Sequence, residues 1–255
     1  MLIKDIKYKD ESFYVSENCN RCVLDIQAHD EPKNAPVIVW FHGGGLTGGA
    51  KHTPPQLLKT PLQSTIVVAA GYRLAAQPDN MSAKECIDDA TEAVAWVFKN
   101  IGKYGGDPTR VFVSGASAGA YLTMMLTMDP KRLRKFGCDY TQIKGIIPLS
   151  GQCITHFQIR AEQHIGILQP TIDEYAPLFF ANTPNLPPIL LVTGDKEMEM
   201  AGRTDENAYL RRMLILNGHQ DVTHYEIQGY GHDMAEPAYR LATTFIDKIS
   251  PPKRA

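Results

Sequence analysis

The chain has 255 residues, of which 44% are apolar and 21% charged, and this is the composition of an ordinary globular protein. A chain of this length buries roughly 70 to 75% of its unfolded surface, so its core needs no disulfide or metal. The 26 basic and 28 acidic residues leave a net charge of -2. This excludes the strongly basic surface that a nucleic-acid partner would require.

The sequence contains no stretch that resembles a membrane anchor or an export signal. No run approaches the ~18 consecutive apolar residues of a membrane span, so we expect none. The first eight residues alternate like a strand and lack the basic start and apolar stretch of a secretory signal. We expect a cytoplasmic protein if the chain is complete, and an exported one if a signal peptide preceded it.

Five cysteines are scattered along the chain, and their odd number favours free thiols. Cys19 and Cys22 form a C-x-x-C sequence. This sequence leads into a strand pattern rather than a helix, which argues against a redox or zinc role for it.

Strand-length apolar segments alternate with helix-length ones, and this alternation is typical of a parallel sheet flanked by helices. After an N-terminal strand, residues 22–28 alternate apolar and polar side chains, as an antiparallel edge strand does. The continuous apolar runs at 37–41 and 66–70 predict buried central strands. Apolar residues at steps of three or four predict a helix over 82–101, with Ser82 as N-cap and Glu85 as its capping-box partner.

The second half of the chain continues the same alternation. We expect a turn at 105–108, strands at 111–114, 145–149, 189–193 and 223–227, and helices at 118–128, 204–216 and 236–249. Residues 151–188 break the rhythm, with five prolines from position 170 onward. We interpret this segment as an insertion after the sixth strand, either a lid or a pocket lining, within a single domain of residues 1–255.

The strongest local signal is the G-x-S-x-G sequence at 115–119, between the predicted strand 111–114 and the predicted helix 118–128. Such an abrupt turn holds its serine in a strained conformation, and the flanking glycines avoid collisions with neighbouring elements. The helix N-terminus also directs backbone N–H groups at the same point. Ser117 is therefore the predicted nucleophile, and the alternative interpretation is a simple glycine-serine turn.

A second signal is the run of three glycines that follows His42, directly after the apolar strand 37–41. Consecutive glycines lose much backbone entropy on folding unless their amides must approach another group closely. We expect Gly44, Gly45 and the amide of Ala118 to form an oxyanion hole. A flexible loop is the alternative, and we expect His42 to shape this loop rather than to act as a base.

A serine hydroxyl needs a base, and the base needs a carboxylate that fixes its tautomer. Of eight histidines, only His232 lies in a glycine-rich loop between a late strand and the last helix, where the chain order serine, acid, histidine places the base. The acid should follow the strand 189–193, where Glu197 and Asp195 compete. We favour Glu197 because it stands far enough along the loop to reach the histidine, whereas Asp195 directly follows a glycine, as capping residues do.

With these residues in place, the chain resembles the α/β-hydrolase superfamily, specifically the esterase/lipase branch related to hormone-sensitive lipase and the small microbial carboxylesterases. The likeness spans nearly the whole chain, and it includes Tyr72-Arg73-Leu74 and the Gly-Gly-Asp-Pro-x-Arg sequence at 105–110. The resemblance implies an α/β-hydrolase fold with a mostly parallel eight-stranded sheet, a triad and an oxyanion hole. Many relatives carry Asp three residues after the glycine that ends the acid's strand; here Glu197 stands there, which keeps Asp195 as an alternative.

We therefore predict a serine carboxylic-ester hydrolase that acts through an acyl-enzyme and needs neither a metal nor a cofactor. Its expected partner is a small-molecule ester with a short acyl group, or a carbohydrate-linked ester by likeness to acetyl xylan and feruloyl esterases. One alternative is a peptidase of the prolyl-oligopeptidase type, although 255 residues leave no room for the usual propeller domain. The other is a non-catalytic binding protein, although a binder needs no complete serine, histidine and acid set.

Overall fold

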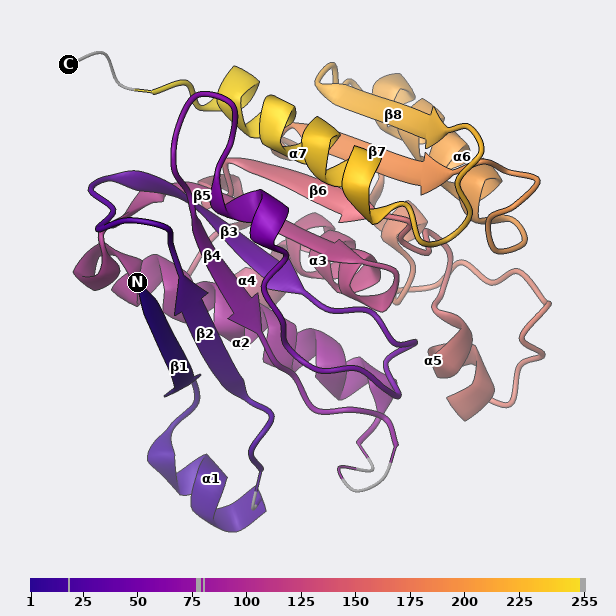
Figure 1. The fold of residues 1–255 in the computed structure, drawn as a ribbon. Helices are drawn as coiled ribbons and strands as arrows, with labels where there is room; N and C mark the ends of the chain where they lie inside the picture. Colours follow the sequence, from indigo (N-terminus) through magenta and orange to yellow (C-terminus); the bar gives the residue numbers. More distant parts are fainter. Residues whose placement is uncertain (18, 77–78, 80, 253–255) are drawn as a thin grey trace.

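The computed structural model describes residues 1–17, 19–76, 79 and 81–252. Within them, eight strands form one sheet in the order β1-β2-β4-β3-β5-β6-β7-β8 (Figure 1). Pairing is antiparallel between β1 and β2 and between β2 and β4, and parallel from β4 to β8. The strands are β1 (Leu2–Lys7), β2 (Val23–Gln27), β3 (Ala35–Phe41), β4 (Ile66–Ala70), β5 (Gly106–Ala116), β6 (Gly145–Leu149), β7 (Ile189–Gly194) and β8 (Val222–Ile227). The predicted mostly parallel eight-stranded sheet is confirmed.

Helices cover both faces of this sheet. The buried residues of α2 (Ala83–Asn100), α3 (Ala118–Met128) and α6 (Arg203–Leu216) pack in one apolar core with one face. On the other face, α7 (Ala235–Ile249) and the short 3-10 helix η1 (Pro55–Leu58) share a second core, and Figure 1 shows α7 crossing in front of the strands. Because both faces are covered, every residue of β3 and β4 is buried, which explains their continuous apolar sequences.

The predicted elements lie within a few residues of the observed ones, and the capping box of Ser82 and Glu85 at the start of α2 is present. The turn expected at 105–108 is only partly correct. Gly105 is in the left-handed conformation, but β5 already begins at Gly106. Its register with β3 shifts between Ala35 and Val37, where Asp107 accepts the amide hydrogen of Thr109. The motif is therefore an irregularity within a strand rather than a turn before it.

Several short helices lack the long apolar periodicity that predicts the other helices. They are α1 (Glu11–Glu17), α4 (Pro130–Lys135), η2 (Ile101–Tyr104), η3 (Tyr140–Gln142), and, between β6 and β7, α5 (Phe157–Glu162) and η4 (Pro177–Phe180). Figure 1 shows α5 on the side toward which the arrowheads of the parallel strands point. This carboxyl edge is where open parallel sheets bind their ligands.

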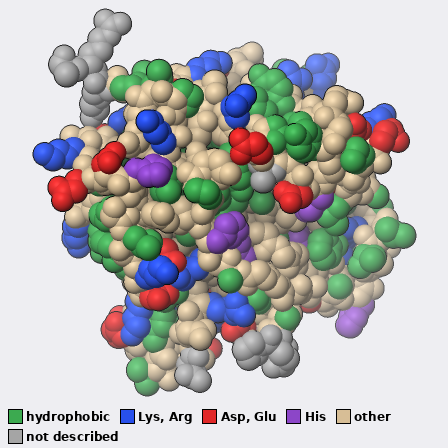
Figure 2. Space-filling view, viewed as in Figure 1, with side chains coloured by type: hydrophobic (Ala, Val, Ile, Leu, Met, Phe, Trp, Pro, Cys, Tyr) green, Lys and Arg blue, Asp and Glu red, His purple; other side chains and the backbone are tan. Residues whose placement is uncertain are grey.

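None of the described helices is long and apolar enough to cross a membrane. On the face drawn in Figure 2, the basic and acidic side chains of the described residues are interspersed over the surface, consistent with the near balance of charges in the sequence.

Candidate active site

Ser117 stands at the junction between β5 and α3, with backbone angles φ 55° and ψ -115°. Such a positive φ is strained for a residue with a side chain, so the surrounding packing must hold it in place. A Cβ at Gly119 would lie 2.1 Å from the carbonyl oxygen of Phe41, and a Cβ at Gly115 would lie 2.5 Å from the carbonyl carbon of Gly119. The two glycines of the motif therefore let the helix start in contact with the strands, which fixes the sharp bend at Ser117.

The glycine loop after β3 lies directly against this bend. A Cβ at Gly43 would be 3.3 Å from the Cβ of Ser117. Gly44 and Gly45 have φ values of 113° and 64°, and the carbonyl of Gly44 accepts hydrogen bonds from the amides of Thr47 and Gly48. Only glycine adopts this path without strain, since a Cβ at Gly44 would lie 2.2 Å from the oxygen of Gly48.

Three amides are predicted to face a substrate oxygen, those of Gly44, Gly45 and Ala118. Ala118 is the first residue of α3, where the amide has no partner within the helix. Throughout the described part of the chain, the amides of Gly44, Gly45 and Ala118 donate no hydrogen bond to another protein group. The three amides therefore stay available as hydrogen-bond donors.

His42 supports the loop and is buried, as expected for a shaping residue. Its Nδ1 lies 2.7 Å from the carbonyl oxygen of Gly43, and its ring stacks on Tyr72 at 4.3 Å between centroids. The hydroxyl of Tyr72 donates to the carbonyl of His42 at 2.8 Å. Burial lowers the pKa of His42 to about 4, so the ring is neutral near pH 7.

His232, in the loop between β8 and α7, contacts the carboxylate of Glu199. Its Nδ1 lies 2.6 Å from Oε1 of Glu199. Burial alone would raise the pKa of Glu199, but hydrogen bonds from His232 and Ser150 lower it to about 2. The side chain of Glu199 has no exposed surface, whereas 35% of the His232 side chain is exposed. A buried, ionised carboxylate thus orients a histidine that can still reach a ligand.

The expectation that Glu197, or failing it Asp195, contacts His232 is not met. After β7 the chain makes one helical turn, in which the amide of Glu199 donates to the carbonyl of Asp195. This turn brings Glu199 back against the sheet and leaves the side chain of Glu197 80% exposed. Asp195 caps the turn instead, because its carboxylate accepts the amide hydrogens of Glu197 and Gly229.

Sequence reasoning missed Glu199 because it counted positions along an extended loop. The signal that could have found it is Asp195 itself, a common first residue of a helical turn, with a second acid four positions later. Residues four apart lie on the same side of a helical turn. Glu199 therefore lies on the side of the turn where β7 ends, whereas Glu197 lies on the opposite side.

Ser150, directly after β6, is a further site residue that the sequence did not indicate. Its hydroxyl donates to Oε2 of Glu199 at 2.7 Å and lies 3.0 Å from Nδ1 of His232. Ser150 has a φ of 52° and is buried, and its carbonyl accepts a hydrogen bond from the guanidinium of Arg203 on α6. The same helix supports the next residue through Asn207, which donates to the carbonyl of Gly151.

The turn after β6, which carries Ser150, also links His232 to Ser117. The amide of Ser117 donates to the carbonyl of Leu149 at 2.8 Å, and Leu149 directly precedes Ser150. The loops of Glu199 and His232 meet as well, since the amide of Asp195 donates to the carbonyl of Tyr230 at 2.7 Å. The serine, the histidine and the carboxylate therefore stand on adjoining loops of one sheet edge.

The segment between β6 and β7 covers part of this edge. A Cβ at Gly45 would lie 3.0 Å from Cζ of Phe157, so this ring lies against the glycine loop. The amide of Phe157 donates to Gln152, and at the other end of α5 the carboxylate of Glu162 accepts the amide hydrogen of Ala83. Helix α5 is thus held between the turn after β6 and the start of α2.

Residues 3–171 match the model of the carboxylesterase family. The chain belongs to the carboxylesterase family. The resemblance to the esterase/lipase branch of the α/β-hydrolases, predicted from the glycine motifs, is thereby confirmed.

Individual relatives match this chain over only part of their own length. Esterase cest-33 of Caenorhabditis elegans is 35% identical over 147 residues, which are 54% of this chain and 25% of that protein. Carboxylesterase NlhH of Mycobacterium tuberculosis is 38% identical over 95 residues, 36% of this chain and 29% of that protein. The matched part of the carboxylesterase-family chain thus spans less than a third of either relative.

Solved structures share the fold of the carboxylesterase-family chain over nearly its whole length. A thermophilic esterase of Thermogutta terrifontis, solved with propionate bound, has a TM-score of 0.74 at 20% identity, over 99% of this chain and 96% of that one. A hyperthermophilic esterase of Pyrobaculum calidifontis has a TM-score of 0.71 at 21% identity, over 90% and 80% of the two chains. These likenesses confirm the predicted α/β-hydrolase fold.

Proposed function

We propose that the protein is a serine carboxylic-ester hydrolase in which Ser117 is the nucleophile, His232 the base and Glu199 the acid of the triad. The observation that carries this proposal is the buried Glu199 carboxylate 2.6 Å from Nδ1 of His232, on a loop that adjoins the strained bend of Ser117. Because Glu199 holds the proton on Nδ1, Nε2 is left to accept the proton of the serine hydroxyl.

The reaction then follows from these positions. Ser117 Oγ attacks the ester carbonyl carbon while its proton passes to Nε2 of His232. The negative charge that develops on the carbonyl oxygen is bound by the amides of Gly44, Gly45 and Ala118. Collapse of this intermediate expels the alcohol, which takes the proton from His232, and water hydrolyses the acyl-enzyme by the same steps. Each of these roles belongs to a residue of the chain itself.

The substrate class that fits best is a small ester with a short acyl group. Phe157 lies against Gly45 and narrows the space beside the amide donors. The segment 151–188 that carries it acts as a pocket lining or lid over a single catalytic domain of residues 1–255. We include carbohydrate-linked esters with a small acyl group in this proposal.

Hydrolysis of p-nitrophenyl acetate by the purified chain, with a peptide p-nitroanilide in parallel, tests this function. We expect the ester alone to be hydrolysed, and Ser117→Ala to lower kcat by about 10³-fold or more. A fluorophosphonate reagent should label Ser117 in the wild type and leave the variant unlabelled. Hydrolysis of the anilide would favour a peptidase, and an inactive, unlabelled wild type would favour a binding protein.

A further inference from the structure

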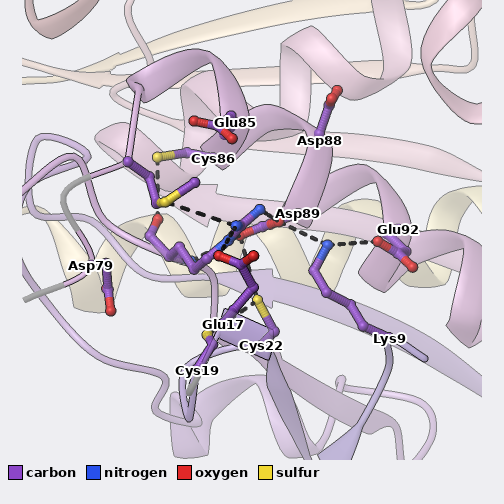
Figure 3. A network of polar contacts seen from close by, with 12 residues as sticks. Lys9, Glu17, Cys19, Cys22, Asp79, Glu85, Cys86, Asp88, Asp89 and Glu92 are labelled. Atoms are coloured by element: carbon purple, nitrogen blue, oxygen red, sulfur yellow. Dashed lines mark hydrogen bonds and ion pairs between the residues drawn. The ribbon is translucent and has the colours of Figure 1, made fainter. Parts of the chain in front are cut away.

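Two cysteines outside the proposed active site form a close pair. Cys19 and Cys22 lie between α1 and β2, and their Sγ atoms are 3.8 Å apart (Figure 3). Cys22 is fully buried, whereas Cys19 is partly exposed. Among the described residues, no group of three or more side chains that could hold a metal ion occurs. The chemistry that the pair offers is that of two adjacent thiols.

The buried thiol stands beside a charged cluster. Sγ of Cys22 donates to Oδ2 of Asp89 at 3.4 Å, and Figure 3 shows this sulfur below the carboxylate. Asp89 also accepts two hydrogen bonds of 2.8 Å from the guanidinium of Arg73 and pairs with Lys9 at 2.9 Å. This cluster fixes the buried member of the pair, Cys22, against α2.

The two thiols differ in acidity. A hydrogen bond with Cys22 lowers the pKa of Cys19 to about 6, whereas that bond and burial raise the pKa of Cys22 far above its usual range. The partly exposed sulfur is thus the more acidic of the two. A low-pKa, accessible cysteine beside a second thiol is the usual arrangement of an oxidisable pair.

Although a strand rather than a helix follows the C-x-x-C sequence, which from the sequence alone argues against a redox role, the two sulfurs lie close together. We propose that Cys19 and Cys22 are a redox-active dithiol that hydrogen peroxide converts to an intramolecular disulfide, and that this disulfide slows the proposed hydrolase. The Cys19 thiolate attacks peroxide, which leaves a sulfenic acid on Cys19 and releases hydroxide. The Cys22 sulfur then attacks the sulfenic sulfur, and its proton leaves with the hydroxyl group as water. The two sulfurs lose two electrons in total, and the peroxide gains them.

Closure must move the loop between the two cysteines, because the sulfurs have to approach from 3.8 Å to about 2.05 Å. Arg21 lies in this loop and contacts the glycine loop of the proposed active site. Its guanidinium donates to the carbonyl of Gly49 at 3.3 Å and pairs with Asp79 at 2.7 Å. A Cβ at Gly49 would lie 2.5 Å from the oxygen of Gly43, so Gly49 packs on the residue that adjoins Ser117.

The same loop is also fixed from its other side. The carbonyl of Arg21 lies 2.2 Å from where a Cβ of Gly71 would be, and Gly71 directly precedes Tyr72, whose ring stacks on His42. A movement of the loop between Cys19 and Cys22 therefore displaces the glycine loop through two sets of contacts, one at Gly49 and one at His42. Displaced oxyanion donors slow the reaction, so we expect oxidation to lower kcat by about 10-fold or more.

Peptide mapping tests the disulfide without any assay of hydrolysis. Trypsin cleaves after Arg21, between the two cysteines, so the oxidised protein should yield the peptides 10–21 and 22–33 joined until a reductant is added. We expect this joined pair after peroxide treatment of the wild type and of Cys138→Ser, and its absence in Cys19→Ser. Peptides that stay separate, or Cys19 joined to another cysteine or another molecule, would overturn the pair.

The effect on hydrolysis rests on the proposed function and is measured separately, with p-nitrophenyl acetate. Wild type and Cys138→Ser should lose activity with peroxide and regain it with dithiothreitol, whereas Cys19→Ser should keep its activity throughout. Joined peptides with unchanged hydrolysis would overturn the link to the glycine loop. Because Cys19 is partly exposed, its variant tests the proposal even if Cys22→Ser fails to fold.

Discussion

At the scale of single residues, the acid of the triad is the assignment that most needs a test. Glu199→Gln keeps the size of the side chain but removes the charge that fixes the tautomer of His232. We expect kcat for p-nitrophenyl acetate to fall by about 10³- to 10⁴-fold with little change in KM. Glu197→Gln is the matched control, since that side chain is 80% exposed, and its kcat should stay at the wild-type value. Equal losses in both variants would contradict the assignment of Glu199.

Ser150 is expected to act through Glu199 as a positioning residue. Ser150→Ala removes a hydrogen bond of 2.7 Å to a buried carboxylate, and such bonds contribute about 1.5 to 3 kcal/mol. If this stabilisation serves the transition state, kcat falls by roughly 10- to 100-fold at constant KM. Ser114→Ala also removes a buried serine hydroxyl, bonded to the carbonyl of Ile147, but should lower only the thermal stability. A loss of stability without a loss of kcat in Ser150→Ala would refute the positioning role.

The sequence predicted the position of Ser117 but not the partners of His232, and the difference has a physical reason. The place of Ser117 is set by glycines next to it in the chain, and the contacts of Gly119 with Phe41 show why a local pattern suffices. The partners of His232 are set by how three separate loops meet. Nothing in the sequence around Ser150 or Glu199 shows that a helical turn and a positive φ bring them to one histidine.

At the scale of secondary-structure elements, long periodic segments were predictable and short ones were not. The helix α2 has both a continuous apolar stripe and a capping box, so two independent signals agree on its start. In contrast, α1 has no buried residue, and α4 buries only Leu133. With so little apolar surface, such helices depend on contacts such as the N-cap bond of Asp129 in α4, which apolar periodicity does not reveal.

Helix α5 is expected to set the acyl specificity through Phe157. Phe157→Ala removes the ring that lies against Gly45, so space opens beside the oxyanion donors. We expect kcat/KM for p-nitrophenyl hexanoate to rise about 10-fold relative to the acetate, because a few methylenes then find an apolar wall. Phe179→Ala on η4 is the control, since this ring is 54% exposed, and should leave the ratio unchanged. An unchanged ratio in Phe157→Ala would show that the acyl group points elsewhere.

At the scale of the whole molecule, one buried carboxylate joins the antiparallel edge of the sheet to the helical layer. Asp89 on α2 pairs with Lys9 after β1 and with Arg73 after β4, and it accepts the thiol hydrogen of Cys22 before β2. Burial alone would raise the pKa of Asp89, but the hydrogen bonds of Arg73 and the charge of Lys9 hold it below the ordinary value of 3.8. Folding therefore favours the ionised form of this carboxyl.

This linkage gives a prediction for global stability. Asp89→Asn takes the bidentate carboxylate from the mostly buried Arg73 and leaves Lys9 paired with Glu92 alone, so we expect the free energy of unfolding near pH 7 to fall by about 3 kcal/mol. The contribution of Asp89 is fully present above its ordinary pKa of 3.8 and declines as the pH falls below it, because the unfolded chain then binds the proton first. The difference in the free energy of unfolding between the wild type and Asp89→Asn should thus become smaller in acid.

Urea unfolding followed by far-UV circular dichroism, at about pH 7 and about pH 3, measures this gap. Asp139→Asn provides the control, because its pair with Arg134 lies at the surface, with 35% and 59% of the two side chains exposed. Such pairs contribute about 0 to 1 kcal/mol, so the control should unfold close to the wild type at neutral pH. If Asp89→Asn lost no more than Asp139→Asn, the cluster would not hold the edge of the sheet to α2. A gap that stayed constant into acid would instead show that the ionisation of Asp89 is not the source of the stability.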